Sequence, residues 1–278
     1  MKRIQPVVPF LKWVGGKRQL INSLVPLLPE KIAAYCEPFV GGGALLFRIQ
    51  PQTAYINDIN SELIRVYKVI KDDVEALIDA LQEFRNDSDY YYEVRDWDRD
   101  IIGYSALSDI KKAARIIYLN KTCYNGLFRV NGAGAFNTPF GNYRNPNIVN
   151  SPTLRAVSSY LNAAAVSLTS LDYADALKSL PAETFVYMDP PYDPISDTSS
   201  FTGYAKSGFS REDQIRLREC CDDLDRRRFK FMLSNSATDF IRELYADYNI
   251  TVVQAKRAIN SDASKRGEID EVVVRNYG

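Results

Sequence analysis

A buried strand that stops at an aspartate and two prolines is the feature that most constrains this chain. Residues 184–188 are apolar or aromatic, and Asp189-Pro190-Pro191-Tyr192 follows them directly. Proline cannot donate to a strand ladder, and it restricts the residue before it to extended geometry. We therefore expect Asp189 to be held rigidly at the carboxyl end of a strand, where open α/β sheets bind their ligands. A simple turn is the alternative interpretation of these four residues taken alone.

A glycine-rich turn between a strand and a helix occurs early in the chain. Residues 34–37 have the pattern of a strand, residues 41–43 are all glycine, and a helical run begins at Ala44. This order is typical of the first unit of a nucleotide-binding α/β sheet. The spacing is not G-x-G-x-x-G, which argues against a nicotinamide or flavin dinucleotide.

A second strand, residues 53–57, ends at Asp58, 17 residues after the first of these glycines. A carboxylate there can accept hydrogen bonds from ribose hydroxyls. A helix cap is an equally open interpretation of Asp58. Nearer the N-terminus, Gly15 and Gly16 precede a helical pattern and expose backbone N–H groups to an anionic group. Trp13 and Lys17 beside them offer a stacking face and a charge.

The middle of the chain has the composition of an insertion between sheet elements. An amphipathic helix is expected from Ser61 to Phe84, and a further helix around residues 108–121, with no strand of the sheet until about residue 166. Aromatic, basic and asparagine side chains are concentrated in residues 86–150. Such a mixture suits contacts to phosphates and to base edges.

The sheet pattern resumes in the last part of the chain. Strands are expected at 166–168 (leading to Asp172), 229–233, 250–256 and 268–275, and the last two predict a terminal antiparallel hairpin. A helix begins at Ser210 with a capping-box signature. The loop from Ile195 to Phe209 is a candidate mobile lid. We therefore predict an α/β fold: a catalytic domain of residues 1–60 and 151–278, and a mostly helical insertion of residues 61–150.

Charge is distributed unevenly although the net charge is zero. Residues 1–29 contain five bases and no acid, residues 53–100 thirteen acids and six bases, and residues 101–160 seven bases and one acid. The seven bases are Lys111, Lys112, Arg115, Lys121, Arg129, Arg144 and Arg155. This asymmetry predicts one basic face for a polyanion, the alternative being a merely solvated face.

Several classes of protein are excluded or disfavoured by what the sequence lacks. There is no histidine, so no imidazole can act as a general base and the common zinc sites are excluded. The four cysteines show no paired spacing, which predicts neither a disulfide framework nor a metal site. No run is apolar enough to span a bilayer, and the N-terminus does not resemble a secretory signal. We expect a soluble cytoplasmic protein.

Four short blocks, in this order, resemble the N6-adenine DNA methyltransferases of the Dam type over essentially the whole chain. They lie at residues 12–17, 37–43, 57–60 and 189–192, and residues 124–129 with 136–141 resemble the target-recognition region of that family. The resemblance implies a Rossmann-like sheet that binds S-adenosylmethionine and a substrate adenine in duplex DNA, within GATC. A monomer without a metal is expected.

The resemblance also implies roles for individual residues. The catalytic residues are Asp189, Pro190 and Tyr192. The cofactor is contacted by Trp13, Lys17, Phe39, Gly41, Gly43, Asp58, Asp172 and Asp189. The DNA is contacted by Lys12, Lys121, Tyr124, Asn125, Leu127, Arg129, Pro139, Tyr143 and Arg144. Arg129 is placed on a guanine of the outer base pair, whereas Lys121 and Arg144 suit phosphates. Relatives commonly have arginine where this chain has Asn142, so the resemblance carries no backbone contact to that position, and Arg144 nearby is the candidate substitute.

The chemistry follows from the poor nucleophilicity of adenine's exocyclic amine. Two acceptors, the Asp189 carboxylate and the Pro190 carbonyl, would favour a pyramidal nitrogen, and Tyr192 would stack on the flipped base. Three alternatives stay open: a nicotinamide dinucleotide oxidoreductase, a non-catalytic DNA-binding protein on a relict methyltransferase scaffold, and a related enzyme that methylates RNA or protein glutamine. The sequence does not distinguish a solitary enzyme from part of a restriction-modification system.

Overall fold

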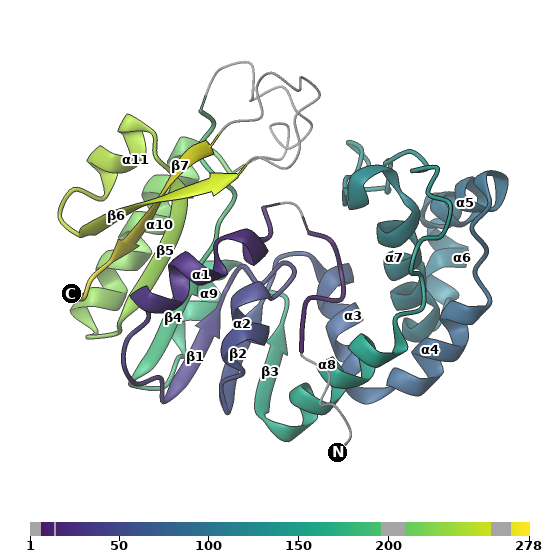
Figure 1. Ribbon diagram of the computed structural model, residues 1–278, viewed down its shortest axis with the longest axis horizontal. Coiled ribbons are helices and arrows are strands. Elements are labelled where there is room, and N and C mark those ends of the chain that lie inside the picture. The colour runs from purple at the N-terminus through teal and green to yellow at the C-terminus, as the bar shows by residue number, and fades with distance from the viewer. Residues whose placement is uncertain (1–6, 14, 196–208, 257–267) are drawn as a thin grey trace. The chain divides into compact units, whose positions relative to one another are not determined.

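The seven strands of the described residues form one mixed sheet, in the order β3-β2-β1-β4-β5-β7-β6 (Figure 1). The computed structural model describes residues 7–13, 15–195, 209–256 and 268–278. The strands are β1 (Ala34–Glu37), β2 (Thr53–Asn57), β3 (Ala165–Thr169), β4 (Thr184–Met188), β5 (Phe231–Ser236), β6 (Asn249–Lys256) and β7 (Glu268–Arg275).

The chain divides into two compact units, each described by itself below. The first unit comprises Met1–Gly16, Gly41–Gln50 and Asp58–Ser170, and the second Lys17–Val40, Pro51–Asn57 and Leu171–Gly278. The predicted insertion of residues 61–150 falls within the first unit, and the sheet strands other than β3 fall within the second.

Parallel pairing of β2, β1, β4 and β5 forms the centre of the second unit. β1 pairs with β2 and β4, with Tyr35 opposite Ala54 and Phe185, and β4 pairs with β5. All five residues of β4 are buried. A strand covered on both faces is expected to be apolar throughout, as this one is. The carboxyl ends of these strands therefore lie along one edge of the sheet.

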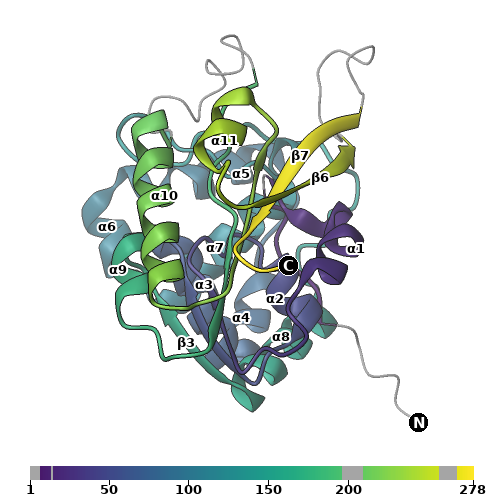
Figure 2. The same cartoon turned by 90° about the vertical axis from the view of Figure 1, so that its left-hand side faces the viewer.

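The terminal hairpin predicted from the sequence is confirmed (Figure 2). β7 lies between β5 and β6 and is antiparallel to both, so that Glu271 lies opposite Ser236 of β5 and Val253 of β6. The polar loop at 258–267 lies outside the described residues. Residues 196–208 of the predicted lid also lie outside them.

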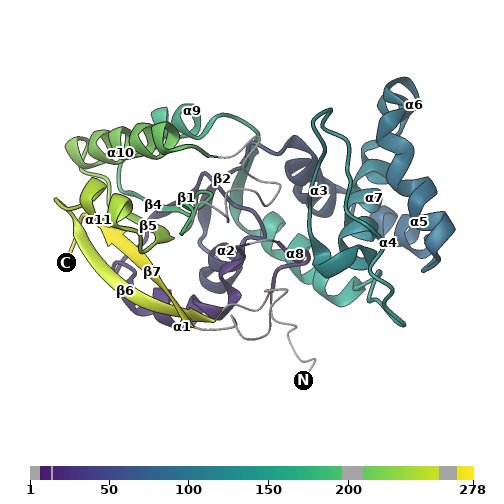
Figure 3. The same cartoon turned by 90° about the horizontal axis from the view of Figure 1, so that it is seen from above.

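Helices cover both faces of this sheet within the second unit (Figure 3). α9 (Tyr173–Lys178), α10 (Arg211–Arg226) and α11 (Asp239–Leu244) pack on one face, over a core that includes Val186, Leu233 and Val272. The other face carries η1 (Lys17–Gln19), α1 (Ile21–Leu24) and η2 (Val25–Leu27). The predicted capping box at Ser210 is confirmed, with Asp213 as its partner.

The first unit is mostly helical. Its helices are α2 (Ala44–Ile49), α3 (Ser61–Asp72), α4 (Val74–Gln82), α5 (Ser88–Arg95), η3 (Asp96–Arg99), α6 (Ile101–Ala106), α7 (Asp109–Thr122), η4 (Tyr124–Gly126) and α8 (Ser151–Ala163). The helix expected around 108–121 is confirmed as α7. The single helix expected from Ser61 to Phe84 is wrong, because Asp73 (φ −136°, ψ 40°) leaves the helical region and separates α3 from α4.

Candidate active site

Asp189 follows the last residue of β4, as the sequence predicted. Met188 is fully buried and lies opposite Leu233 of β5, and β1 flanks the strand on its other side. Because both neighbours of β4 are parallel to it, Asp189 lies at the carboxyl edge of the parallel strands. This is the edge at which open α/β sheets bind ligands.

Lys17 and Tyr192 meet Asp189 at this edge. The ammonium nitrogen of Lys17 lies 2.8 Å from Oδ1 of Asp189 and 4.5 Å from the centroid of the Tyr192 ring. Only 5% of the Lys17 side chain is exposed. Burial raises the pKa of Asp189, and the positive charge of Lys17 opposes that rise without cancelling it. A half-buried carboxylate, an ammonium group and an aromatic ring are thus held together.

The hydroxyl of Tyr192 has a partner on the terminal hairpin. It donates a hydrogen bond of 2.7 Å to Oε2 of Glu271 in β7. Burial, and then the negative charges of Asp189 and Glu271, raise the pKa of the Tyr192 phenol well above its ordinary value. The phenol therefore stays neutral and keeps its proton for this hydrogen bond.

Two buried amides hold the backbone of the turn after β4. The side chain of Gln214 in α10 donates to the Pro191 carbonyl (2.9 Å) and accepts from Asn235 in β5 (3.0 Å). Asn235 in turn accepts from the N–H of Asp193 (3.1 Å). Both amide side chains are fully buried and hydrogen-bonded. Satisfied buried polar networks of this kind impose a single geometry on the groups that they join.

The glycine turn at 41–43 leaves no room for side chains. Gly41 and Gly43 have positive φ angles of 47° and 65°. A β-carbon at Gly41 would lie 2.7 Å from Cδ1 of Trp13, and one at Gly43 would lie 2.7 Å from the hydroxyl oxygen of Tyr67. Both positions therefore require glycine, for conformation and for space. Trp13, which the sequence predicted on the cofactor side, packs against this turn.

Asp58 holds the same turn. Its Oδ2 accepts from the N–H of Gly41 (3.0 Å) and its Oδ1 from the N–H of Asn60 (2.9 Å). Burial raises the pKa of Asp58, although both N–H groups oppose the rise. The interpretation of Asp58 as a helix cap is wrong, because the side chain of Asn60 caps α3 by accepting from the N–H of Leu63.

Phe39 and Asp172 have partners within the second unit. The Phe39 ring lies 5.1 Å from that of Tyr173. The carboxylate of Asp172 caps α9 through the N–H of Ala174 and receives two hydrogen bonds from Arg216, of 2.7 and 2.9 Å. The hydrogen bonds from Arg216 are the main reason why the pKa of Asp172 is lowered. Asp172 is thus an ionised carboxylate with a strong existing partner.

The segment predicted to read DNA is held in the first unit by its backbone. The buried side chain of Asn120 in α7 accepts from the N–H of Lys12 (2.9 Å) and donates to the carbonyls of Lys12 (2.7 Å) and Gly126 (3.0 Å). The N–H of Tyr124 donates to the Pro139 carbonyl (2.8 Å). The Tyr124–Gly126 turn, the segment around Lys12 and the segment around Pro139 are thereby joined.

Tyr143 supports the same turn from its other side. Its hydroxyl accepts from the N–H of Asn125 (3.0 Å), which has a positive φ of 57°. Asn142 is exposed and has a φ of 54°. Asparagine tolerates this conformation better than most residues. Arg144, two positions later, is exposed.

Arg129 lies on an exposed arm closed by a bridge between Val130 and Phe136. Its Nε donates to Oδ1 of Asn137 (2.8 Å), and its side chain is exposed. Tyr124 is 55% exposed, and Pro139 is exposed as well. Leu127 and Lys121 are half-buried. Most of the predicted DNA contacts are therefore accessible side chains on a braced backbone.

The chain is similar to known DNA methyltransferases over most of its length. The family model described as D12 class N6 adenine-specific DNA methyltransferase matches residues 13–259. The chain belongs to this family. It is 46% identical to the type II methyltransferase M1.LlaDCHI of Lactococcus lactis over 97% of this chain and 95% of the relative. It is 42% identical to the type II methyltransferase M.MjaIII of Methanocaldococcus jannaschii (98% and 99%), and 33% identical to the DNA adenine methylase of Escherichia coli K12 (95% and 93%).

Membership of the D12 class supports an adenine-specific DNA methyltransferase and a Rossmann-like methyltransferase fold. The oxidoreductase alternative is therefore wrong, in agreement with the absence of its glycine fingerprint. DNA is the substrate class, and a methyltransferase of this family implies a methyl donor of the S-adenosylmethionine type.

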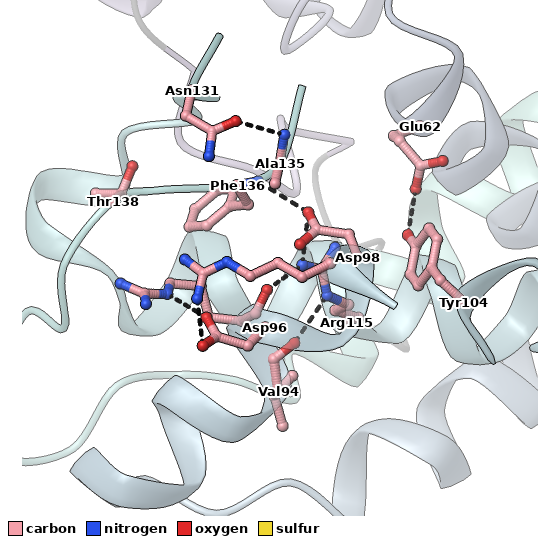
Figure 4. A network of polar contacts seen from close by, with 12 residues as sticks. Glu62, Val94, Asp96, Asp98, Tyr104, Arg115, Asn131, Ala135, Phe136 and Thr138 are labelled. Carbon is pink, nitrogen blue, oxygen red and sulfur yellow. Dashed lines mark hydrogen bonds and ion pairs between the residues drawn. The ribbon is translucent and has the colours of Figure 1, made fainter. Parts of the chain in front are cut away.

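The interpretation of the basic segment 101–160 needs correction (Figure 4). Arg115 is 1% exposed, pairs with Asp98 (2.9 Å) and donates to the Val94 carbonyl (2.9 Å), so it cannot face a polyanion. Asp98 also accepts from the N–H of Phe136 (2.8 Å). Arg155 pairs with Glu75. The other five bases of the segment are the ones available for a basic surface.

The sequence did not predict four residues that support the candidate residues of the two units: Asn120 in the first unit, and Gln214, Asn235 and Glu271 in the second. Glu271 carried a signal, since it lies inside an expected strand and directly precedes three valines, whereas Asn235 stands between two serines beyond the strand expected at 229–233. Asn120 and Gln214 lie on helices where a polar residue is ordinary, so no pattern distinguished them.

Other features of the chain add little to the site. The four cysteines are free, and Cys36, Cys123 and Cys221 are buried. Burial raises the pKa of Cys123 to about 12. Among the residues that the structure describes, no group of three or more acidic or cysteine side chains is placed to hold a metal ion. No described helix is long and apolar enough to cross a membrane.

Proposed function

We propose that this protein transfers a methyl group from S-adenosylmethionine to N6 of an adenine flipped out of duplex DNA, within GATC. The observation that carries the proposal is the arrangement around Asp189. The Lys17 ammonium forms an ion pair with the Asp189 carboxylate while lying over the Tyr192 ring. A flipped adenine needs the same two features: an acceptor for the N–H of its amine, and an aromatic ring on which the base stacks.

The residues of the turn act by positioning and electrostatics. Asp189 and the Pro190 carbonyl accept the two N–H groups of the amine, which leaves the nitrogen lone pair aimed at the methyl group. The turn backbone is held by Gln214, so little reorganisation is needed as the reaction proceeds. Asp189 acts in its ionised form. No covalent intermediate is required.

The cofactor residues fit S-adenosylmethionine on two observations. The turn at 41–43 has no side-chain atoms at the positions of Gly41 and Gly43, and Asp58 carries a half-buried carboxylate that can accept from hydroxyl groups. The cofactor supplies an electrophilic methyl group. We assign contacts with it to Trp13, Lys17, Phe39, Gly41, Gly43, Asp58, Asp172 and Asp189, as the family resemblance implies.

DNA recognition is assigned to the braced, exposed segment of the first unit. Arg129 reads the guanine of the outer base pair, since a guanidinium can donate two parallel hydrogen bonds to O6 and N7. Tyr124, Asn125, Leu127, Pro139 and Tyr143 contact bases or the neighbouring backbone. Lys12, Lys121 and Arg144 contact phosphates, which hold the register without reading sequence. Flipping the adenine costs a few kcal/mol.

The test is methyl transfer from radiolabelled S-adenosylmethionine to synthetic duplexes, with the product nucleoside identified by mass spectrometry. We expect N6-methyladenine in a GATC duplex, and about 10–200-fold slower transfer when the outer base pair is changed. Incorporation without that preference would overturn GATC and leave the activity standing. Tight binding of the duplex without any incorporation would support the non-catalytic alternative instead.

A further inference from the structure

Glu271 is a carboxylate at a position where a strand normally has none. It lies in β7, the strand between β5 and β6, and three valines follow it at 272–274. Glutamate is depleted in strands, and here it is half-buried beside the buried Ser236 of β5. A residue that breaks a local rule is expected at a functional site. The mechanism described above does not use it.

The side chain of Glu271 reaches the catalytic turn. Strand alternation places Val272 and Val274 in the core under α9–α11, so Glu271 belongs to the opposite face. On that face, its Oε2 accepts the hydroxyl hydrogen bond of Tyr192 at 2.7 Å. A hydrogen bond to an ionised acceptor is about twice as strong as one between neutral groups. The far end of the Tyr192 ring is thereby anchored to the sheet.

We propose that Glu271 is a positioning residue for methyl transfer, which holds the ring of Tyr192 in the plane on which the target adenine stacks. The inference rests on the proposed role of Tyr192. Pro191 restricts the backbone on one side of Tyr192, but the ring can still rotate about its two side-chain torsions. The hydrogen bond to Glu271 fixes the position of the hydroxyl oxygen, and because a phenol O–H prefers to lie in the plane of its ring, the direction of the bond also favours one ring plane. The terminal hairpin thereby contributes directly to the active site.

The hydrogen bond to Glu271 also affects how strongly the Tyr192 ring attracts a group that lies over its face. The Tyr192 ring carries the Lys17 ammonium at 4.5 Å from its centroid. A phenol that donates to a carboxylate gains electron density, and chains of hydrogen bonds polarise one another in this way. Glu271 therefore both orients the Tyr192 ring and makes its face more attractive to an electron-poor group such as the target adenine.

The test is a double-mutant cycle on Glu271 and Tyr192. Glu271→Ala and Tyr192→Phe each remove the anchor, so each should lower kcat about tenfold at saturating cofactor and DNA. The double variant should be no slower than the single variants by more than about twofold, because the second change has nothing left to remove. Glu271→Gln keeps an acceptor oxygen and should recover activity to within about threefold of the wild type.

Calorimetry with S-adenosylmethionine and far-ultraviolet circular dichroism accompany the rates. Unchanged cofactor affinity and spectrum are expected for all variants, since a folding defect would change both. If Glu271→Ala lowers kcat as much in the Tyr192→Phe background as in the wild type, Glu271 does not act through Tyr192 and the proposal is overturned. An unchanged kcat for Glu271→Ala overturns it equally. A wild-type protein inactive on every duplex would instead refute the proposed function.

Discussion

The turn after β4, to which we assign catalysis, and the segment 124–144, to which we assign DNA reading, are built in different ways. In the turn, Asp189 and Tyr192 are engaged by side chains, Lys17 and Glu271, before any substrate arrives. In the segment, hydrogen bonds to the backbone hold the turn, while the side chains of Tyr124 and Arg129 are exposed and, among the described residues, that of Arg129 donates only to Asn137, within the segment.

The difference follows from what each region has to do. Methyl transfer needs acceptors and a stacking face within a few tenths of an ångström of their working positions, so their orientation is established by the fold. Reading a duplex requires side chains that exchange water for base edges and phosphates when DNA binds. A braced backbone limits the number of side chains that must be ordered in that step.

The largest expected effect is on the catalytic turn itself. Asp189→Asn keeps the size of the side chain but removes the charge that favours the reactive form of the amine. We expect kcat to fall about 10³-fold or more, while duplex binding in a mobility-shift assay is retained. Turnover within tenfold of the wild type would contradict the assigned role. A loss of duplex binding equal to the loss of kcat would show that the two regions are not separable.

The next effect concerns the scaffold of the reading segment. Arg115→Ala leaves the Asp98 carboxylate without its partner inside the first unit, and should lower the free energy of unfolding by about 3–5 kcal/mol. Urea denaturation followed by circular dichroism measures this. The matched control is Arg155→Ala, which removes an exposed pair with Glu75 and should cost less than about 1 kcal/mol. Equal effects would show that Arg115 is not a structural residue.

The fold was largely predictable because its signals are local. Prolines after Asp189, glycines at 41–43 and alternating or continuous apolar runs marked most of the strands, and the hairpin of β6 and β7 followed from a polar loop between two runs. The helix break at Asp73 was missed, because the apolar spacing continues across it. Periodicity reports which face is buried and does not register a single residue with non-helical angles.

The site was predictable where one residue performs the chemistry and hidden where partners come from distant segments. Asp189 and Tyr192 were visible because they adjoin prolines in sequence. Glu271 is 79 residues from Tyr192 and Asn120 is 108 residues from Lys12, so only the fold brings them together. For Arg115 the prediction was wrong in the other direction, because it was counted as part of a basic surface although it is buried. The sequence does not show that Asp98 pairs with it in the core.

A smaller effect tests the sequence-reading side chains. Arg129→Ala should lower kcat/KM on GATC about 10–200-fold, equivalent to about 1–3 kcal/mol, and much less on duplexes altered at the outer base pair. The guanidinium already donates to Asn137, which presets its direction. Methylation rates on near-cognate duplexes provide the measurement.

Arg144→Ala is the control for this comparison, with Lys121→Ala as a second case. Each should weaken all duplexes alike and reduce the slope of affinity against salt concentration by about one phosphate contact. If Arg129→Ala slowed every duplex equally, Arg129 would be a phosphate contact as well.

The smallest effect is a displacement of the pH profile, with opposite signs for two neighbours of Asp189. Methyl transfer requires the ionised carboxylate, so a raised pKa keeps it protonated, and inactive, up to a higher pH than an ordinary aspartate. Lys17 opposes that rise and Glu271 adds to it. In Lys17→Met the acid limb of kcat/KM for DNA, at saturating cofactor, should therefore move to higher pH. In Glu271→Gln it should move to lower pH. Lys178→Met removes an exposed charge that pairs with Asp175 and should leave the limb in place. If the acid limb moved in the same direction in Lys17→Met and Glu271→Gln, or did not move in either, it would report another carboxylate, such as Asp58, instead of Asp189.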